Sequence, residues 1–542
     1  MGLGRPLPSL ALPAASLIAA AATACAPGGA AAGTADGHLV YATGLEPDCL
    51  DPQVSGLEVT ALIDRSIFDS LVGMTPDGRF HPWLAERWTV SEDGRTYTFH
   101  LRSGVRFHDG TPLDAAAVKA TLDHAVDPET KSRYAASLVR SYASAEVVAP
   151  RVVKVRLREP DASFLQALST AHLGIQPTAR LRGNAEALCG TPVGSGPFRF
   201  AGWTRGKQVV LTRNPGYSWG PGYAGHRGPA HLERLSIGFV PEGSVRLGAL
   251  TAGQADMVDG VPTTNAASVR SSGRTRLLRA DMPGAVFGIF LNGTRGVLAD
   301  ERVRTALMRA VDIDRLVESV YSGEYSRAWS PLSPATTGYS RATEGSWPYD
   351  PALSDRLLDQ AGWTGRDSAG YRTKNGERLA LRWPYMSKLM QDRRHVLAQG
   401  VQAHAKRVGI AVDLVNEDGG AMARDVLQGT MDLYSTSLAR AEPDILRYYF
   451  ARDRTPPKGG GNFFRLSDSR LDRLLRDAAA TTDPAVRARH YAEVQDRLLR
   501  KALVVPLYVP VRLVGASTEV RGVRFDSHAY PLFYEARKGG GK

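Results

Sequence analysis

The residues best suited to chemistry are few and dispersed along the chain. The 542 residues contain no G-x-S-x-G, H-E-x-x-H or G-x-x-x-x-G-K-[ST] pattern, and no G-x-G-x-x-G after a predicted strand. Ser195 lies in the run Gly194 to Gly196, which is better explained as a tight turn than as a nucleophile's setting. The closest histidine pair, His226 and His231, lies in a polar Gly-Pro turn. The sequence therefore predicts no catalytic residue, no metal site and no cofactor.

The first 24 residues have the layout of a secretory signal peptide. Arg5 is the one basic residue, and an uncharged, mostly apolar run of 16 residues follows from Ser9 to Ala24. That run is shorter than the roughly 20 residues that a membrane-spanning helix needs. We expect residues 1–24 to direct export and then to be removed.

Cys25 follows three small residues, and this pattern resembles the lipobox of bacterial lipoproteins, in which the cysteine is acylated and becomes the N-terminus. The lipobox prefers Leu three positions before the cysteine, where this chain has Ala22, so an ordinary signal-peptidase cut stays an alternative. Residues 26–37 contain no large apolar side chain and would span on the order of 20 Å as a flexible chain. We expect residues 25–37 to form a lipid-anchored tether on the outer face of the cell membrane.

Two cysteines remain, Cys49 and Cys189. Exported proteins fold in an oxidising compartment, where two cysteines usually pair, and neither residue has the close Cys or His spacing of a metal site. We predict a Cys49–Cys189 disulfide, with two buried thiols as the alternative.

The composition is that of a folded protein with more than one domain. The mature chain has about 518 residues, 43% of the sequence is hydrophobic, and no later segment has 18 uncharged apolar residues in a row. The net charge of +12 is spread along the chain without a run of five basic residues, which favours a solvated basic surface over nucleic-acid binding.

Alternating strand and helix patterns predict a mixed α/β fold. Residues 95–101 alternate in polarity after an Asp-Gly turn, which is typical of a hairpin. Residues 114–126 are predicted to form a helix. Longer helices are predicted at 300–321, 350–361 and 393–408, and the segment 468–503 is strongly helical. Residues 504–514 are predicted to be a strand pair whose prolines favour edge positions.

These elements come in an order that resembles the family 5 extracellular solute-binding proteins, the dipeptide- and oligopeptide-binding subunits of ABC importers. The densest match runs from Phe68 to Val118 and includes Trp88, Asp93-Gly94, Phe99 and Asp109-Gly110. Four further segments resemble sequence motifs of the family: Pro192 to Tyr217, Gly253 to Asp256, Arg302 to Asp314 and Tyr349 to Gly362.

The resemblance implies a two-lobed α/β periplasmic-binding-protein fold with a hinge between the lobes. Lobe I would comprise residues 38–63, 195–281 and 500–542, with an extra subdomain at 64–194, and lobe II would comprise residues 282–499. Hinge closure would enclose a short peptide or another small polar solute, and the closed form would deliver it to the permease subunits of an ABC importer. The resemblance implies a monomer that catalyses no reaction.

One stretch departs from the family pattern. Peptide-binding members grip the ligand's α-amino group with an acidic residue that a Trp precedes, whereas this chain has Thr436 at the Trp position and Ala439 or Arg440 at the acidic one. Glu442 and Asp444 follow, as ligands for an amine or as parts of a polar turn. We expect the loop from Tyr434 to Asp444 to face the loop near Glu46. The candidate ligand-binding residues are Glu46, Ser437, Arg440, Glu442, Asp444, Asn462 and Phe463.

Two other classes of function stay open at this point. One is an exported hydrolase or biosynthetic enzyme on the same scaffold, and the other is a receptor that senses its ligand without transport. Saturable stabilisation by an unchanged ligand would separate a binding protein from an enzyme, which consumes it.

Overall fold

The computed structural model describes residues 37–132, 134–387, 390 and 392–539. The predicted signal peptide, Cys25 and nearly all of the predicted tether lie outside the described residues. Among the described residues, no helix combines the length and apolar character that crossing a membrane requires.

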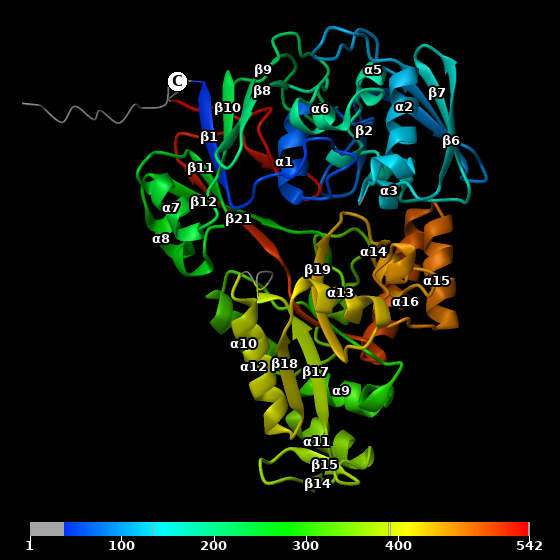
Figure 1. The fold of residues 1–542 in the computed structure, drawn as a ribbon, viewed down its shortest axis with the longest axis vertical. Coiled ribbons are helices and arrows are strands. Elements are labelled where there is room, and N and C mark those ends of the chain that lie inside the picture. Colours follow the sequence, from blue (N-terminus) through cyan, green and yellow to red (C-terminus); the bar gives the residue numbers. More distant parts are fainter. Residues whose placement is uncertain (1–36, 133, 388–389, 391, 540–542) are drawn as a thin grey trace, which may run out of the picture. The chain divides into compact units, whose positions relative to one another are not determined.

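Lobe I is built on a seven-stranded mixed sheet in the order β12-β21-β11-β1-β10-β9-β8 (Figure 1). β1 is parallel to both of its neighbours, β10 and β11, and its residues Leu39, Tyr41 and Ala42 are buried. The strands are β1 (His38–Thr43), β8 (Phe198–Thr204), β9 (Gln208–Arg213), β10 (Arg234–Phe239), β11 (Met257–Asp259), β12 (Thr275–Asp281) and β21 (Val511–Ser517), and the short pair is β22 (Arg524–Phe525) and β23 (Pro531–Leu532). The helices are α1 (Glu58–Ile67), α7 (Gly243–Thr251) and α8 (Ala266–Ser271).

The subdomain carries a four-stranded antiparallel sheet in the order β4-β5-β7-β6. The predicted hairpin is present, with Tyr97, Phe99 and Leu101 on the buried face of β5. Its strands are β2 (Val72–Met74), β3 (Phe80–Pro82), β4 (Ala85–Val90), β5 (Thr96–Leu101), β6 (Tyr142–Ala149) and β7 (Val152–Leu157). Its helices are α2 (Ala115–Val126), α3 (Ala135–Leu138), α4 (Phe164–Ala167), α5 (Thr178–Leu181) and α6 (Ala185–Gly190).

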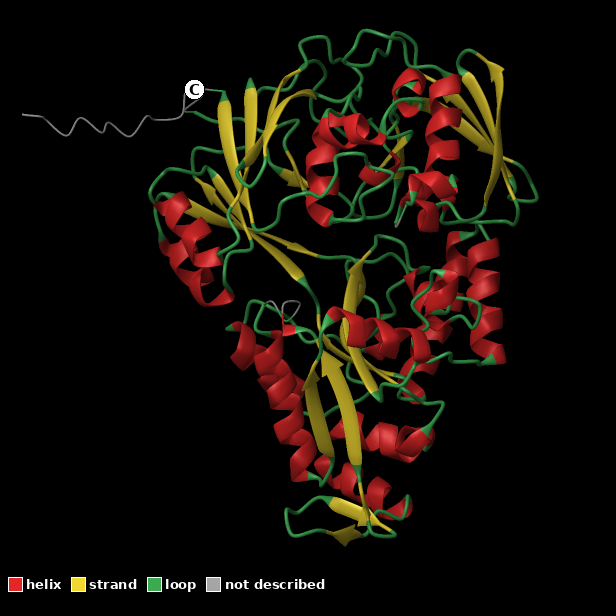
Figure 2. Ribbon diagram, in the orientation of Figure 1, coloured by secondary structure: helices red, strands yellow, loops and turns green. Residues whose placement is uncertain are grey.

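Lobe II combines a β19-β13-β20 sheet, a parallel β17-β18 pair and most of the long helices (Figure 2). Its strands are β13 (Gly284–Leu291), β14 (Gly365–Arg366), β15 (Arg372–Lys374), β16 (Glu377–Arg378), β17 (Ala380–Tyr385), β18 (Ala411–Asn416), β19 (Leu433–Ala439) and β20 (Val504–Tyr508). Its helices are α9 (Glu301–Ala310), α10 (Ile313–Tyr321), α11 (Pro351–Gln360), α12 (Arg394–Arg407), α13 (Gly419–Gln428), α14 (Ile445–Phe450), α15 (Ser469–Ala480) and α16 (Pro484–Arg500).

The chain passes between the lobes at 281–284 and again at 508–511. Met282 N donates to Pro510 O at 2.8 Å, so the two crossings lie side by side and form the hinge. The predicted return to lobe I at residue 500 is wrong, because β20 pairs with β13 in lobe II. β20 and β21 therefore belong to different sheets and are not a strand pair; β20 is an edge strand, as its proline suggests, whereas β21 lies between two neighbours.

Two segments predicted to be helical each form two helices. Residues 300–321 break where Val311 is extended and Asp312 accepts a hydrogen bond from Arg315 N, capping α10. Residues 468–503 break before Pro484, where Asp483 caps α16. Both breaks come at a residue that favours a helix start over helix continuation.

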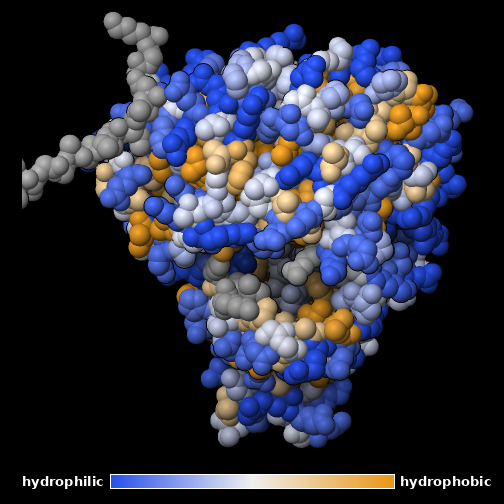
Figure 3. All heavy atoms as spheres, turned by 45° about the horizontal axis from the view of Figure 1, so that its top comes forward, coloured by the Kyte–Doolittle hydropathy of each residue, from blue (hydrophilic) through white to orange (hydrophobic). Residues whose placement is uncertain are grey.

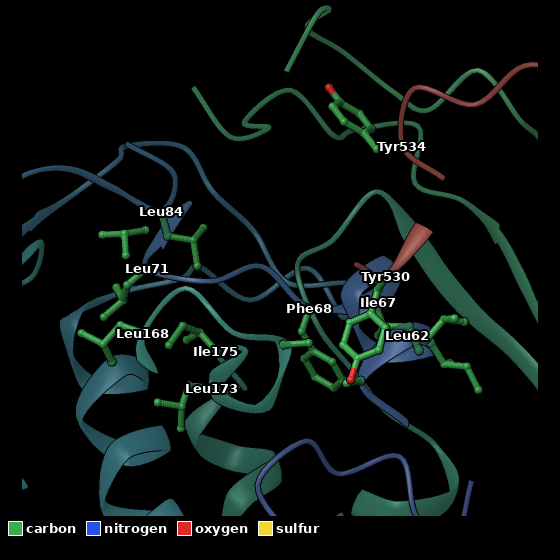
Figure 4. Packing of buried hydrophobic residues seen from close by; sticks show 14 of the residues in the cluster. Leu62, Ile67, Phe68, Leu71, Leu84, Leu168, Leu173, Ile175, Tyr530 and Tyr534 are labelled. Atoms are coloured by element: carbon green, nitrogen blue, oxygen red, sulfur yellow. The ribbon is translucent and has the colours of Figure 1, made fainter. Parts of the chain in front are cut away.

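Lobe I and the subdomain share one hydrophobic core. The predicted boundary at 63/64 falls inside α1, and the buried side chains of α1 pack with those of the subdomain and of the C-terminal segment. Figure 4 shows Phe68 between Ile175 on one side and Ile67 and Tyr530 on the other, with Leu62 beside Tyr530. Because no separate core divides them, we expect the subdomain to move with lobe I.

Cys49 and Cys189 form a disulfide, with their Cα atoms 4.4 Å apart. The bond joins the loop after β1 to the end of α6, and Leu50 N donates to Cys189 O at 3.0 Å beside it. The disulfide therefore fastens the subdomain to lobe I.

Candidate functional site

A polar cavity lies where the subdomain meets lobe II. Its volume is about 40 Å³, which is room for a few water molecules but not for a solute. Elsewhere, near the middle of the view in Figure 3, the surface is hollowed between the upper and the lower part of the molecule. The lining of the polar cavity combines charged and hydroxyl side chains from both sides: Ser137, Leu138, Arg140, Asp161, Ser163, Gln166, Arg440, Glu442, Asp444, Arg447, Tyr448, Arg454 and Gly459.

Arg440 is placed in this cavity by the end of β19. Ala439 pairs with Gly284 of β13, and Arg440 N donates to Pro283 O at 3.2 Å, so the backbone at Arg440 is tied to the hinge. The side chain is only 7% exposed, and its Cζ lies 5.6 Å from the centre of the Tyr134 ring. Arg440 thus reaches from lobe II to the subdomain.

The guanidinium of Arg440 is charged and lacks an ion-pair partner among the described residues. Burial alone would lower the pKa of Arg440, but Tyr134, Asp444 and Glu442 nearby raise it above its ordinary value. Nε of Arg440 is buried and donates to no acceptor in the described part of the chain. A buried, charged donor without a partner is costly, so this group is suited to binding an anion.

Glu442 and Asp444 line the same cavity but are already paired within lobe II. Glu442 forms an ion pair with Arg487, and Asp444 accepts from Arg447 Nε at 3.0 Å and from Tyr491 Oη at 3.0 Å. Burial raises the pKa of Glu442, while Arg487 opposes this shift. These contacts favour the interpretation of Glu442 and Asp444 as parts of a polar turn over their role as ligands for an amine.

Gln166 lines the cavity, and His528 of lobe I lies behind it. The Gln166 amide lies 3.2 Å from His528 Nε2, and both side chains are buried. Burial lowers the pKa of His528, which favours the neutral ring. Both ring nitrogens of His528 already have partners, Gln166 and Ser527, so His528 positions the Gln166 amide at the cavity wall.

A second, larger space of about 320 Å³ opens beside the hinge. It is lined by Pro76 of the subdomain, Arg279 to Asp281 and Pro283 at the hinge, Ala335 of lobe II, and Phe525 to Ser527 and Ala529 of lobe I. Pro283 lines this space and its carbonyl oxygen accepts from Arg440 N, and Arg440 lines the polar cavity, so the two spaces lie close together. This space reaches the size of small-molecule sites.

Direct hydrogen bonds hold the subdomain against lobe II. Ala162 N donates to Ala479 O at 2.9 Å, and Arg140 Nη2 donates to Lys458 O at 2.6 Å. Glu159 adds a partly exposed ion pair with Arg447 at 3.8 Å. These contacts must break for a solute to reach Arg440, so ligand entry requires the lobes to open.

The structure differs from the prediction for Glu46. Its carboxylate accepts from Trp203 Nε1 at 3.0 Å and from Gly206 N at 3.1 Å, so the loop after β1 leans on the β8–β9 hairpin. The loop from Tyr434 to Asp444 lies against Tyr134 and the subdomain instead.

Three other predicted residues make their contacts within lobe II. Asn462 is 2% exposed, and its side chain donates to Ala451 O and Leu466 O and accepts from Leu466 N. Phe463 packs on Tyr434 and Tyr449. Ser437 is half-buried on β19, opposite the bulge of β13. Of the predicted set, Arg440, Glu442 and Asp444 are brought together.

Sequence reasoning missed Tyr134, Gln166 and His528. Tyr134 lies just before α3 and Gln166 within α4, both in the subdomain, and His528 lies in a turn of the C-terminal segment. None of them is in a motif that marks a binding residue. No group of three or more His, Cys, Asp or Glu side chains that could hold a metal ion occurs in the described ranges.

Residues 79–456 match the model of a family described as "Bacterial extracellular solute-binding proteins, family 5 Middle". The glutathione-binding protein GsiB of Escherichia coli (strain K12) is 28% identical over 490 residues, which are 89% of this chain and 90% of that protein.

Solved structures show the same fold over nearly the whole chain. NikA from Brucella suis, in complex with Fe(III)-EDTA, is 28% identical with a TM-score of 0.82, and the match covers 93% of this chain and 100% of that one. AgaA from A. tumefaciens R10, in complex with agropinic acid, is 26% identical with a TM-score of 0.75, covering 93% and 99%.

Proposed function

Because this chain belongs to the family 5 bacterial extracellular solute-binding proteins, and so serves an ABC importer as its substrate-binding protein, we propose that its ligand is a small solute bearing a carboxylate. The family binds solutes and catalyses no reaction. The two-lobed fold closes about a hinge, and the captured ligand passes to the permease subunits of the importer.

One observation carries the proposal: Arg440 is a buried cation at the lobe boundary without an ion-pair partner among the described residues. The carboxylates that raise its pKa, Glu442 and Asp444, are held by Arg487 and Arg447. A ligand carboxylate would supply the missing acceptor, and charge-assisted bonds of this kind are the strong ones.

The named ligands of the relatives are compatible with this chemistry. Glutathione, agropinic acid and EDTA all carry carboxylates. The position at which peptide-binding members hold the ligand's amine has no acid here, because Ala439 and Arg440 occupy it. We therefore favour acidic small molecules and acidic short peptides over neutral dipeptides.

Thermal denaturation with a panel of solutes tests this function. We expect saturable stabilisation by a carboxylate-bearing solute, since a ligand that binds only the folded state adds RT ln(1 + [L]/Kd) to the free energy of unfolding. The matched control is the same solute with its carboxylate converted to an amide, which should stabilise the protein less. Stabilisation by neutral and amidated solutes alone would contradict the proposal, as would chemical conversion of the bound solute.

We further propose that Cys25 is acylated and anchors the protein outside the cell membrane. We expect Cys25→Ser to move the protein from the membrane fraction to the soluble fraction, because the acyl chain supplies the attachment. Thr34→Ser, in the same segment, should leave the distribution unchanged. Wild-type protein found wholly in the soluble fraction, with an N-terminus other than residue 25, would contradict the anchor.

A further inference from the structure

One edge of the lobe I sheet gathers arginines around the point where the described chain begins. β1 and β10 are parallel and start at the same edge, with His38 opposite Arg234. β9 is antiparallel to β10, so its last residue, Arg213, reaches that edge as well. Figure 1 shows β1 and β10 starting side by side, close to the C-terminal end of the described chain.

The C-terminal segment adds more arginines to this edge. Arg521 and Arg537 are bridged through their backbones, at 2.9 Å in both directions. Arg537 Nη2 lies 3.0 Å from the ring of His231, and Arg213 donates to the carbonyl oxygen of His231. The ring of His231 stacks on that of His226, next to Arg227. We call this set the basic edge: Arg213, Arg227, Arg234, Arg521 and Arg537.

The charge of the basic edge is largely uncompensated. Arg227, Arg234, Arg521 and Arg537 are exposed, and none of them forms an ion pair within the part of the chain that the structure describes. Arg213 is paired with Glu233 at 3.4 Å. Lys538, in the same segment, is buried against Asp256 at 2.9 Å and adds little free charge.

We infer that the basic edge rests on the surface of an anionic lipid bilayer. Charge and position both favour a bilayer as the binding partner. The basic edge surrounds Gly37, the residue to which the predicted tether from Cys25 leads. Within a tether length of on the order of 20 Å, the edge and the bilayer are close to each other. Exposed arginines near such a surface are attracted to its phosphate headgroups, and the attraction falls off within a Debye length.

This contact fixes how the protein lies on the membrane. β1 runs six residues from the basic edge to Thr43, which is about 20 Å of extended chain, and the hinge lies beyond that end of the sheet. Lobe I would thus lie between the bilayer and lobe II, and lobe II would be free to move about the hinge. The tether alone would leave the orientation undefined.

Cosedimentation with vesicles tests the inference without the lipid anchor. The protein used is the Cys25→Ser form, which cannot be acylated, so failure of the anchor proposal and failure of this one are distinguishable. We expect it to bind vesicles of equal parts phosphatidylglycerol and phosphatidylcholine at low salt, to bind phosphatidylcholine vesicles far less, and to dissociate as salt rises.

The decisive variant is Arg234→Gln/Arg521→Gln. The two arginine side chains that it replaces make no ion pair and no hydrogen bond among the described residues. We expect its partition onto the anionic vesicles to fall about tenfold or more. The matched control is Arg473→Gln/Arg476→Gln, which removes two exposed arginines from α15 of lobe II and should keep most of the binding. All variants should melt at the wild-type temperature.

Three outcomes would overturn the inference. The first is equal binding by the Arg234→Gln/Arg521→Gln variant and its parent, and the second is an equal loss in the α15 control. The third is binding to soluble polyphosphate without binding to the anionic vesicles, which would assign the basic edge to a soluble polyanion instead.

Discussion

Arg440→Ala should weaken the binding of a carboxylate-bearing ligand by about 1.5 to 3 kcal/mol, a loss of roughly ten- to a hundredfold in affinity. The guanidinium is buried at the lobe boundary with Nε unpartnered, so a ligand carboxylate would complete its hydrogen bonding in a site of low polarity. Titration calorimetry with the ligand found by thermal denaturation measures this loss. The free energy of unfolding of the empty protein should change little, because relief of the unpartnered buried donor offsets the lost packing on Tyr134.

Two controls separate a specific contact from a general loss of positive charge. Arg454→Ala removes another buried arginine of the same cavity, one whose Nε already lies 3.6 Å from the Asp453 carboxylate, and it should cost less affinity. The amidated ligand should bind wild-type protein and the Arg440→Ala variant equally, because it lacks the carboxylate with which Arg440 would interact. If the Arg440→Ala variant bound the acidic ligand with unchanged affinity, the loop from Tyr434 to Asp444 would have only a structural role.

The elements set by local chemistry could be predicted from the sequence. Asp114 accepts from Ala117 N as the N-cap of α2, and the Asp-Gly turn before β5 forms the expected hairpin. Such features depend on residues within a few positions of each other. The break between α9 and α10 was harder to predict, because the apolar stripe from Val303 to Val317 continues across Val311 in the same period.

The surroundings of Arg440 could not be predicted in the same way. The departure from the family pattern drew attention to Arg440, but Tyr134 is about 300 positions earlier in the chain and His528 about 90 positions later. Only the packing of the subdomain and of the C-terminal segment brings them to the lobe boundary. The hydrogen bonds of Glu46 could not be predicted for the same reason, because its partners Trp203 and Gly206 are 157 and 160 positions later in the chain.

Gly284→Ala should lower the free energy of unfolding by about 3 kcal/mol or more. Gly284 begins β13 directly after the hinge and has φ +104°, a conformation that residues with a side chain rarely adopt. A Cβ atom there would lie 2.3 Å from Leu438 O and 2.5 Å from Arg440 N, and both are backbone atoms that no side-chain rotation can move. Chemical denaturation measures the change in stability.

The same substitution should also lower ligand affinity, since the only relief for these contacts is to displace the end of β19 and, with it, Arg440. Gly248→Ala is the matched control: Gly248 lies in α7, a Cβ there meets no atom within 4 Å, and alanine is the better helix former. A Gly284→Ala protein as stable as wild type, with undiminished affinity, would mean that the hinge end of β19 is not what positions Arg440.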